Sequence, residues 1–269
     1  MNYNTILPVV GATMITFCAN CTSHQSQLFK SVRQKAHKAV TPARITFPEV
    51  QYWYWKRHDA VNKRLQKGNV DILFVGNSIM HGWEETGKKS WNRYFARYKA
   101  VNMGFGWDWT QHTLWRLDHS AFDSISPKLA VVLIGTNNSN GEDNTAREIA
   151  DGIIAVCDRL HNCFPKMKIL LLGIFPREYK PCPQRTKVMT ASLLASEIAD
   201  NKHIYYMDLS SLFIDKNNFL KLDLMPDSLH PNEAGYQVWA ESMAPKIAEL
   251  MNNDENSSWK TASHQRSDH

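Results

Sequence analysis

Short apolar runs alternate with longer amphipathic segments through most of this chain. The short runs end at Gly or polar residues, which is typical of strands buried on both faces of a parallel sheet. They occupy residues 70–75, 100–104, 129–135, 168–173 and 203–208. Helical spacing of apolar positions marks residues 47–66, 91–98, 110–117, 145–164, 186–199 and 231–251. This alternation predicts an α/β domain with a five-stranded parallel sheet covered by helices on both faces.

The two ends of the chain differ from this pattern. Residues 6–18 are almost entirely apolar or small, too short to span a membrane comfortably but as long as the core of a signal peptide. We expect a signal peptide at 1–20, a linker or N-terminal arm at 21–46, one folded domain at 47–251 and a disordered tail at 252–269. The expected location is secreted, periplasmic or at the cell envelope, and cytoplasmic if the first segment is not a signal. Acylation of Cys18 or Cys21 would add a membrane anchor, although the residues before both cysteines suit that modification poorly.

Composition limits the partners that we expect. The chain has 269 residues, 43% of them hydrophobic, and a net charge of +5. Its Lys and Arg residues are scattered, so we expect no nucleic-acid partner. No C-x-x-C pair has a matching second pair, so no zinc site is expected, and Cys157, Cys163 and Cys182 allow at most one internal disulfide. The oligomeric state is left open, with a homodimer as one option.

Polar residues follow three of the predicted strands, where each strand reaches a glycine-containing turn. The turns are Gly76-Asn77-Ser78, Gly104 to Asp108, and Gly135-Thr136-Asn137-Asn138. Because the carboxyl ends of parallel strands share one edge of a sheet, these turns should meet there. Asp227 and His230 stand just before the last predicted helix, in a loop that can reach the same edge.

These residue types suit nucleophilic catalysis. The hydroxyl of Ser78 needs a base to take its proton, His230 can serve near neutral pH, and Asp227 can orient the imidazole. Negative charge on the attacked carbonyl needs fixed donors, and we assign the amide of Asn137 and the backbone N–H groups of Ser78 and Trp107 to this oxyanion hole. Each residue alone has a plainer explanation, as a helix cap or a turn former. The combination at one edge favours a hydrolytic site.

The four blocks together resemble the SGNH (GDSL-type) hydrolases, over residues 71–250. The segments 110–117 and 135–138 are most similar to the catalytic subunits of brain-type platelet-activating-factor acetylhydrolase and their bacterial relatives. The resemblance implies a flavodoxin-like three-layer α/β/α fold and ester hydrolysis through an acyl-enzyme, with no metal or other cofactor. It carries catalytic roles to Ser78, Asp227 and His230 and an oxyanion role to Asn137.

Two positions depart from the family pattern. Asn77 stands where the first block usually has Asp, which keeps one acceptor but loses the charge. Trp107 stands where the second block often has Gly. The backbone N–H of Trp107 is still available, and its side chain must either point away or line the acyl pocket, which would favour a small acyl group.

The function that we expect is hydrolysis of short-chain esters, most often acetyl esters on a carbohydrate. Trp83, Trp107 and Trp109 lie near the predicted edge, where indole rings could stack on a sugar, and Asn77 and Gly106 complete the candidate pocket. One alternative is a lipid-directed acetylhydrolase or lysophospholipase, for which the sequence has no obvious apolar lid. Another is a catalytically silent glycan-binding module, suggested by Asn77. A nucleotide-binding protein is disfavoured because no G-x-G-x-x-G motif follows the first strand.

Overall fold

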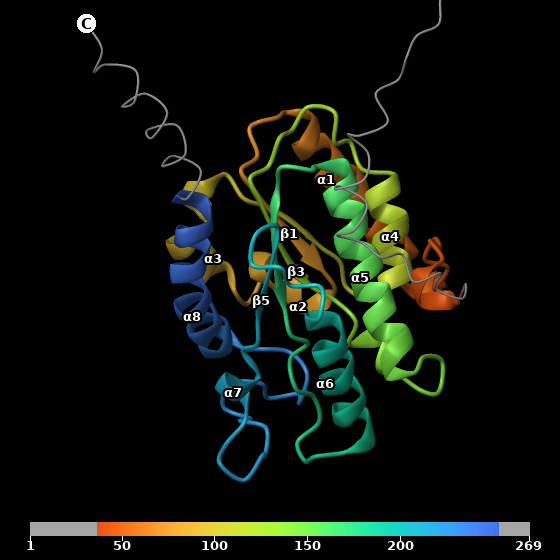
Figure 1. Ribbon diagram of the computed structural model, residues 1–269, viewed down its shortest axis with the longest axis vertical. Helices are drawn as coiled ribbons and strands as arrows, with labels where there is room; N and C mark the ends of the chain where they lie inside the picture. Colours follow the sequence, from red (N-terminus) through yellow and green to blue (C-terminus); the bar gives the residue numbers. More distant parts are fainter. Residues whose placement is uncertain (1–36, 253–269) are drawn as a thin grey trace, which may run out of the picture. The chain divides into compact units, whose positions relative to one another are not determined.

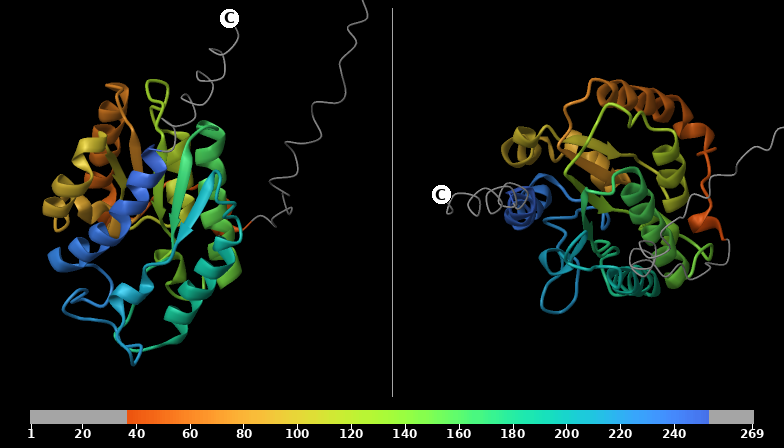
Figure 2. Two further views of the ribbon diagram at one scale, coloured as in Figure 1. Left: turned by 60° about the vertical axis from the view of Figure 1, so that its left-hand side comes forward. Right: turned by 45° about the horizontal axis from the view of Figure 1, so that its top comes forward.

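The computed structural model describes residues 37–252. Five parallel strands form one sheet, as the sequence predicts, and their order is β2-β1-β3-β4-β5. Helices cover both faces of this sheet (Figures 1 and 2). The strands are β1 (Ile72–Gly76), β2 (Val101–Gly104), β3 (Leu129–Leu133), β4 (Lys168–Leu172) and β5 (Ile204–Met207). The expected three-layer α/β/α fold is therefore confirmed.

The helices divide between the two faces. The α-helices are α1 (Pro48–Gln66), α2 (Ser78–His81), α3 (Lys88–Tyr94), α4 (Thr110–Asp118), α5 (Ala146–Cys163), α6 (Pro183–Ser196), α7 (Ser210–Phe213) and α8 (Glu233–Asn252). Four short 3₁₀ turns are η1 (Lys38–Val40), η2 (Gly82–Glu84), η3 (Ala96–Tyr98) and η4 (Asn137–Ser139). Side chains of α1, α4, α5 and α6 pack on one face of the sheet, and those of α2, α3, α7 and α8 pack on the other.

Side-chain alternation along the strands supplies both cores. On β1, Leu73 and Val75 pack toward the α1 side, whereas Ile72 and Phe74 pack toward the α8 side. Successive strand side chains point to opposite faces, so a continuous apolar run is needed when both faces are covered. This explains why the strands read as unbroken hydrophobic segments.

Several boundaries differ from those predicted. The helix expected at 91–98 is the end of α3 followed by η3, and α6 begins before residue 186. Pro183 occupies its first turn, where a missing N–H costs nothing, and the Cys182 sulfur accepts from the N–H of Arg185 at 3.4 Å. The short helices α2 and α7 were not predicted.

The folded domain also begins before the predicted Phe47. Ala39 and Ile45 are buried. The hydroxyl of Thr110 donates to the carbonyl of Ala39 at 2.7 Å, and the N–H of Ala43 donates to the carbonyl of Gln111 at 3.1 Å. Residues 37–46 are thus part of the domain rather than a linker, a correction that periodicity could not supply because this segment makes its contacts without regular structure.

The segment 1–20, which we expect to be a signal peptide, the first part of the expected arm and the tail after Asn252 lie outside the described residues. Within residues 37–252 no helix combines the length and the apolar character needed to cross a membrane.

Strand register places the site. Gly76 at the end of β1 pairs with Gly104 of β2 and with Leu133 of β3, so these three strands end at the same level. A Cβ atom at Gly76 would lie 2.1 Å from the carbonyl oxygen of Leu133, so only glycine allows this approach. The turns that follow the three strands are therefore held together at the carboxyl edge of the sheet.

Candidate active site

Ser78 is the first residue of α2, directly after the turn that leaves β1. Asn77 caps this helix: its side-chain oxygen accepts from the N–H of Ile79 at 3.0 Å. The cap satisfies one of the donors that every helix start leaves unpaired. The hydroxyl of Tyr236 in α8 donates to the carbonyl of the same residue, Ile79, at 2.6 Å. The nucleophile candidate therefore precedes a residue whose N–H and carbonyl are both held by side chains.

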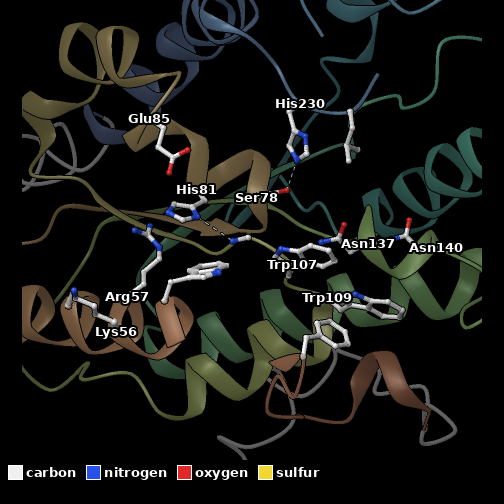
Figure 3. Close-up of a pocket in the computed structure, with 15 residues that line it drawn as sticks. Lys56, Arg57, Ser78, His81, Glu85, Trp107, Trp109, Asn137, Asn140 and His230 are labelled. Atoms are coloured by element: carbon white, nitrogen blue, oxygen red, sulfur yellow. Dashed lines mark hydrogen bonds between the residues drawn. The ribbon is translucent and has the colours of Figure 1, made fainter. Parts of the chain in front are cut away.

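Ser78, His230 and Asp227 form a hydrogen-bonded series, and Figure 3 shows the contact between Ser78 and His230. Ser78 Oγ lies 2.8 Å from His230 Nε2, and His230 Nδ1 lies 2.7 Å from Asp227 Oδ2. An ionised carboxylate only accepts, so the ring proton belongs on Nδ1 and Nε2 is left to accept from the serine. The structure thus brings together the three residues to which the sequence assigned catalysis.

The Asp227 carboxylate is held by backbone donors as well. Its Oδ1 accepts from the N–H groups of Leu229 at 3.0 Å and His230 at 2.7 Å. Burial raises the pKa of Asp227, but these bonds and the ring of His230 outweigh burial, so the pKa is lowered overall. Asp227 is therefore ionised over the neutral range in which the imidazole must be oriented.

Asn137 and Trp107 face the same cavity as Ser78. One amide N–H of Asn137 donates to the carbonyl of Asp108 at 2.9 Å, which fixes the amide and leaves its second N–H for a ligand. Trp107 has φ = 70°, a left-handed conformation that is uncommon for a residue with a Cβ. Its N–H donates to no acceptor in residues 37–252. The expected oxyanion donors are thus gathered in one place, with one of them on a strained residue.

Contacts on both sides hold the Trp107 turn. The N–H of Gly106 donates to His81 Nδ1 at 3.4 Å, and a Cβ at Gly106 would lie 3.1 Å from the Trp53 ring. Glycine therefore lets α1 approach this turn closely. Asp108, on the other side of Trp107, is fully buried. A strained backbone conformation persists only where surrounding contacts hold it in place. The contacts of Gly106 and Asp108 hold Trp107 in this way.

Asp108 anchors a buried polar cluster. Its carboxylate accepts from Tyr54 Oη at 2.5 Å, from Thr113 Oγ1 at 3.1 Å and from Arg116 Nε at 2.8 Å. Burial lowers the pKa of Arg116, but the neighbouring Asp108 carboxylate outweighs it and the pKa is raised. Burial, and next the charge of Asp108, raise the pKa of Tyr54. We did not predict this cluster, although a polar Arg116 within the helical pattern of 110–117 was a signal for it.

Arg177 holds the turn that carries Asn137. Arg177 is 8% exposed, and its guanidinium donates to the carbonyl of Thr136 and the side-chain oxygen of Asn140, each at 3.0 Å. It also reaches the hydroxyl of Ser139 at 3.3 Å. Arg177 lies after β4, in a segment that gave no sequence signal, because an isolated arginine in a loop is usually solvated.

Two of the predicted pocket residues are elsewhere. Trp83 has no exposed surface and packs on Tyr236 and Trp239, with ring centroids 4.6 and 4.5 Å apart. It follows α2 into the core, so it cannot meet a substrate. Asn77 is 1% exposed and serves the helix start rather than the pocket. Gly106, Trp107 and Trp109 do line the cavity, and Trp107 is 53% exposed.

The cavity at Ser78 has a volume of about 920 Å³. Besides the predicted residues it is lined by Phe47, Trp53, Lys56, Arg57, Ala60, His81, Glu85, Asn140 and Leu229. Helix α1 contributes much of this wall, which the sequence did not indicate. Among residues 37–252 no cluster of three or more His, Cys, Asp or Glu side chains is arranged to hold a metal ion.

A model of the GDSL-like Lipase/Acylhydrolase family matches residues 74–238 of this chain. The chain belongs to that family. It is 33% identical over 182 residues to platelet-activating factor acetylhydrolase IB subunit alpha2 of Rattus norvegicus, covering 67% of this chain and 77% of the relative. As a member of the GDSL-like acylhydrolase family, the protein is a carboxylic ester hydrolase.

Solved structures share the fold of this GDSL-like acylhydrolase. A carbohydrate acetylesterase from Sinorhizobium meliloti superposes with a TM-score of 0.54 at 16% identity, covering 67% of this chain and 99% of the other. An acetylxylan esterase from Geobacillus stearothermophilus gives 0.53 at 16% identity, covering 67% and 94%. At such identity the likeness concerns the fold alone.

Proposed function

We propose that this acylhydrolase removes short acyl groups, chiefly acetyl, from hydroxyls of a carbohydrate through an acyl-enzyme on Ser78. The observation that carries the proposal is the 2.8 Å approach of Ser78 Oγ to His230 Nε2 beside the amide of Asn137. A nucleophile, an oriented base and fixed donors in one cavity are what acyl transfer requires.

The proposed reaction has two steps. Ser78 Oγ attacks the ester carbonyl while His230 Nε2 takes the hydroxyl proton, and the oxyanion accepts from Asn137 and from the N–H groups of Ser78 and Trp107. As the C–O bond to the alcohol breaks, His230 returns its proton to the departing oxygen. Water then attacks the acyl-enzyme with the same base, which releases the carboxylic acid and restores the serine. Asp227 stays ionised and orients His230 throughout.

The side chain of Trp107 supports a preference for short acyl groups. It lines the cavity next to its own N–H, and its ring packs edge-on to Phe47 with centroids 6.2 Å apart. A large ring beside the oxyanion donors leaves less space for a long chain bound to the same carbonyl carbon. Trp53 and Trp109 add further indole surface of the kind on which sugar rings stack.

A second candidate is a lipid-directed acetylhydrolase. The 33% identity to a platelet-activating factor acetylhydrolase subunit favours it. Both candidates share the acetyl group and the mechanism and differ in the alcohol. An apolar lid that would cover a lipid chain is not evident around the cavity, whose described rim includes Lys56, Glu85 and Asn140.

Hydrolysis of p-nitrophenyl acetate by wild type and by Ser78→Ala tests the mechanism. We expect turnover to vanish in the variant, with an unchanged circular dichroism spectrum and melting temperature. Equal turnover in both proteins would remove Ser78 as nucleophile. A fluorophosphonate probe provides a second test, because a folded wild type that resists labelling would instead support the silent glycan-binding module.

Export of the protein belongs to the same proposal, supported by the apolar segment at residues 6–18. Mass spectrometry of the mature protein from its source cells would show a new N-terminus near residue 20. An intact Met1 in protein recovered from the cell interior would contradict export.

A further inference from the structure

The outer face of α1 borders the cavity at Ser78. Four of its residues line the cavity: Trp53, Lys56, Arg57 and Ala60. They follow the i, i+3, i+4, i+7 spacing that places side chains on one face of a helix. The buried positions of the same helix, Val50, Tyr54, His58, Val61 and Leu65, form a different face. Helix α1 therefore packs with one side and presents another to the substrate cavity.

We propose that this face of α1, together with His81 and Glu85, is a subsite for an uncharged sugar ring on the alcohol side of the ester. The inference rests on the proposed esterase function and names the part of the substrate that α1 recognises. In the view of Figure 3, Lys56, Arg57, His81 and Glu85 lie on one side of Ser78, whereas Trp107, Asn137 and Trp109 lie on the other.

The cavity has room for an alcohol beside the acyl group. An acetyl group occupies a small part of about 920 Å³. Lys56 and Glu85 line this side beside Trp53, so a longer alkyl chain would bury the two charged groups without partners, which is costly. A polyhydroxylated alcohol can satisfy these groups and also contact the Trp53 ring.

His81 offers a donor of fixed direction. Its Nδ1 accepts from the N–H of Gly106, so the ring proton of the neutral form is on Nε2. Burial, and next the charge of Arg57, lower the pKa of His81 to about 4, so the ring is neutral at physiological pH. The ring is stacked on Trp53 with centroids 5.8 Å apart and an interplanar angle of 28°. No acceptor within residues 37–252 takes the Nε2 proton, which leaves it for a hydroxyl oxygen.

The charges at this subsite balance, which favours an uncharged ligand. Arg57 is paired with Glu84, its NH1 donating to the carboxylate at 2.6 Å, and its Nε donates to the carbonyl of Gly104 at 2.9 Å. Lys56 and Glu85 remain as one cation and one anion at the rim, and their side chains make no hydrogen bond to another residue of the range 37–252. Together they supply donors and an acceptor for hydroxyls, as sugar recognition requires, while a phosphate or carboxylate would meet Glu85 as a like charge.

The α1 part of the subsite lies outside the matched family region, whereas His81 and Glu85 lie inside it. The family model covers residues 74–238, and α1 ends at Gln66. Residues before the matched region can therefore contribute to the choice of alcohol, while Ser78, Asn137, Asp227 and His230 inside it perform acyl transfer.

Two acetyl esters can be compared to measure how much the ring hydroxyls of the alcohol contribute to recognition. Glucose 6-acetate and cyclohexylmethyl acetate share an acetyl ester on a CH₂ attached to a six-membered ring, and only the first has hydroxyls. We expect Lys56→Met and Glu85→Gln each to lower the ratio of kcat/KM for the sugar over the cyclohexyl ester about fivefold, as for one hydrogen bond to a charged group in a partly exposed site. Lys63→Met and Glu49→Gln, which change exposed residues of α1 that do not line the cavity, should keep the wild-type ratio.

The outcomes separate the two proposals. A ratio unchanged within twofold in both variants, or an equal change in the control variants, would overturn the subsite while leaving the esterase intact. A wild type that hydrolyses neither ester nor p-nitrophenyl acetate would overturn the proposed function itself. If Lys56→Met and Glu85→Gln lower kcat/KM more on an acetylated glycerophosphocholine than on glucose 6-acetate, the sugar is rejected and the subsite binds a lipid headgroup instead.

Discussion

The N–H of Glu178 donates to the carbonyl of Ser228 at 2.8 Å, and both residues have positive φ, 66° and 64°. This bond joins the segment after β4 to the loop that carries Asp227 and His230. The residue before Glu178 is Arg177, which holds the turn of Asn137. Two residues of one loop thus connect the oxyanion amide to the base, although the two groups come from distant parts of the sequence.

We predict that Arg177→Met lowers kcat on p-nitrophenyl acetate about tenfold and changes KM less than twofold. Loss of a complete oxyanion donor costs about 10²–10³ in rate, and a loosened turn should cost a fraction of this. Steady-state kinetics, normalised by fluorophosphonate titration of active serines, would measure the effect.

A matched arginine provides the control for this prediction. Arg64 donates to the carbonyls of Gly68 at 2.9 Å and Asn69 at 3.2 Å, in the loop before β1 and away from the cavity. Arg64→Met should keep kcat. If both variants lose activity equally, Arg177 supports the fold in general and not the Asn137 turn.

Substitution of Trp107 separates its bulk from its backbone strain. Trp107→Ala and Trp107→Gly both remove the ring, so both should flatten the decline of kcat/KM from acetate to octanoate esters. Only glycine relieves the left-handed φ of 70°, so Trp107→Gly should be more stable than Trp107→Ala by about 1 kcal/mol. Acyl-chain profiles and urea unfolding would measure the two effects. A wild type with a flat profile would refute the role of the ring.

Asn77 should act through its acceptor and not through its charge. Asn77→Asp keeps the oxygen that binds the N–H of Ile79, so we expect kcat to stay within about threefold of wild type. Asn77→Ala removes the cap and should lower the free energy of unfolding by about 1 kcal/mol. Kinetics and urea unfolding test both variants, and a tenfold rise of kcat in Asn77→Asp would show that the family's negative charge matters here.

Asp158 should make stability depend on pH far from the active site. Burial raises the pKa of its carboxyl to about 6, and its Oδ1 is buried without a hydrogen bond. The folded protein therefore holds this proton more tightly than the unfolded chain, whose Asp pKa is about 3.9. The contribution to stability is present below about pH 4 and is lost as the pH rises toward 6.

Asp158→Asn should consequently stabilise the protein more at pH 7 than at pH 4.5. Urea unfolding at both values gives the comparison, and an equal effect at both would contradict the raised pKa. Asp123→Asn, which changes an exposed carboxylate, is the control.

The sequence allowed us to predict the sheet and the main site residues because both depend on local patterns. Apolar runs define the strands, and the parallel arrangement brings the turns of Ser78, Trp107 and Asn137 to one edge. Sequence patterns do not show which polar face of a helix borders a cavity, so we did not predict that α1 lines the cavity at Ser78. Trp83 illustrates the same limit: it is close to Ser78 in sequence, but the short helix between them directs it into the core.

The oxyanion donor at position 107 is a main-chain N–H, so its chemistry is independent of the side chain attached to it. Evolution can therefore exchange this side chain, and with it the shape of the acyl pocket, without losing the donor itself. The hydrogen bonds of Gly106 with His81 and of Asp108 with Arg116 keep the turn in place when the side chain at position 107 changes. Substrate range in such an enzyme can diversify at a single codon, whereas the neighbouring positions 106 and 108 should tolerate almost no replacement.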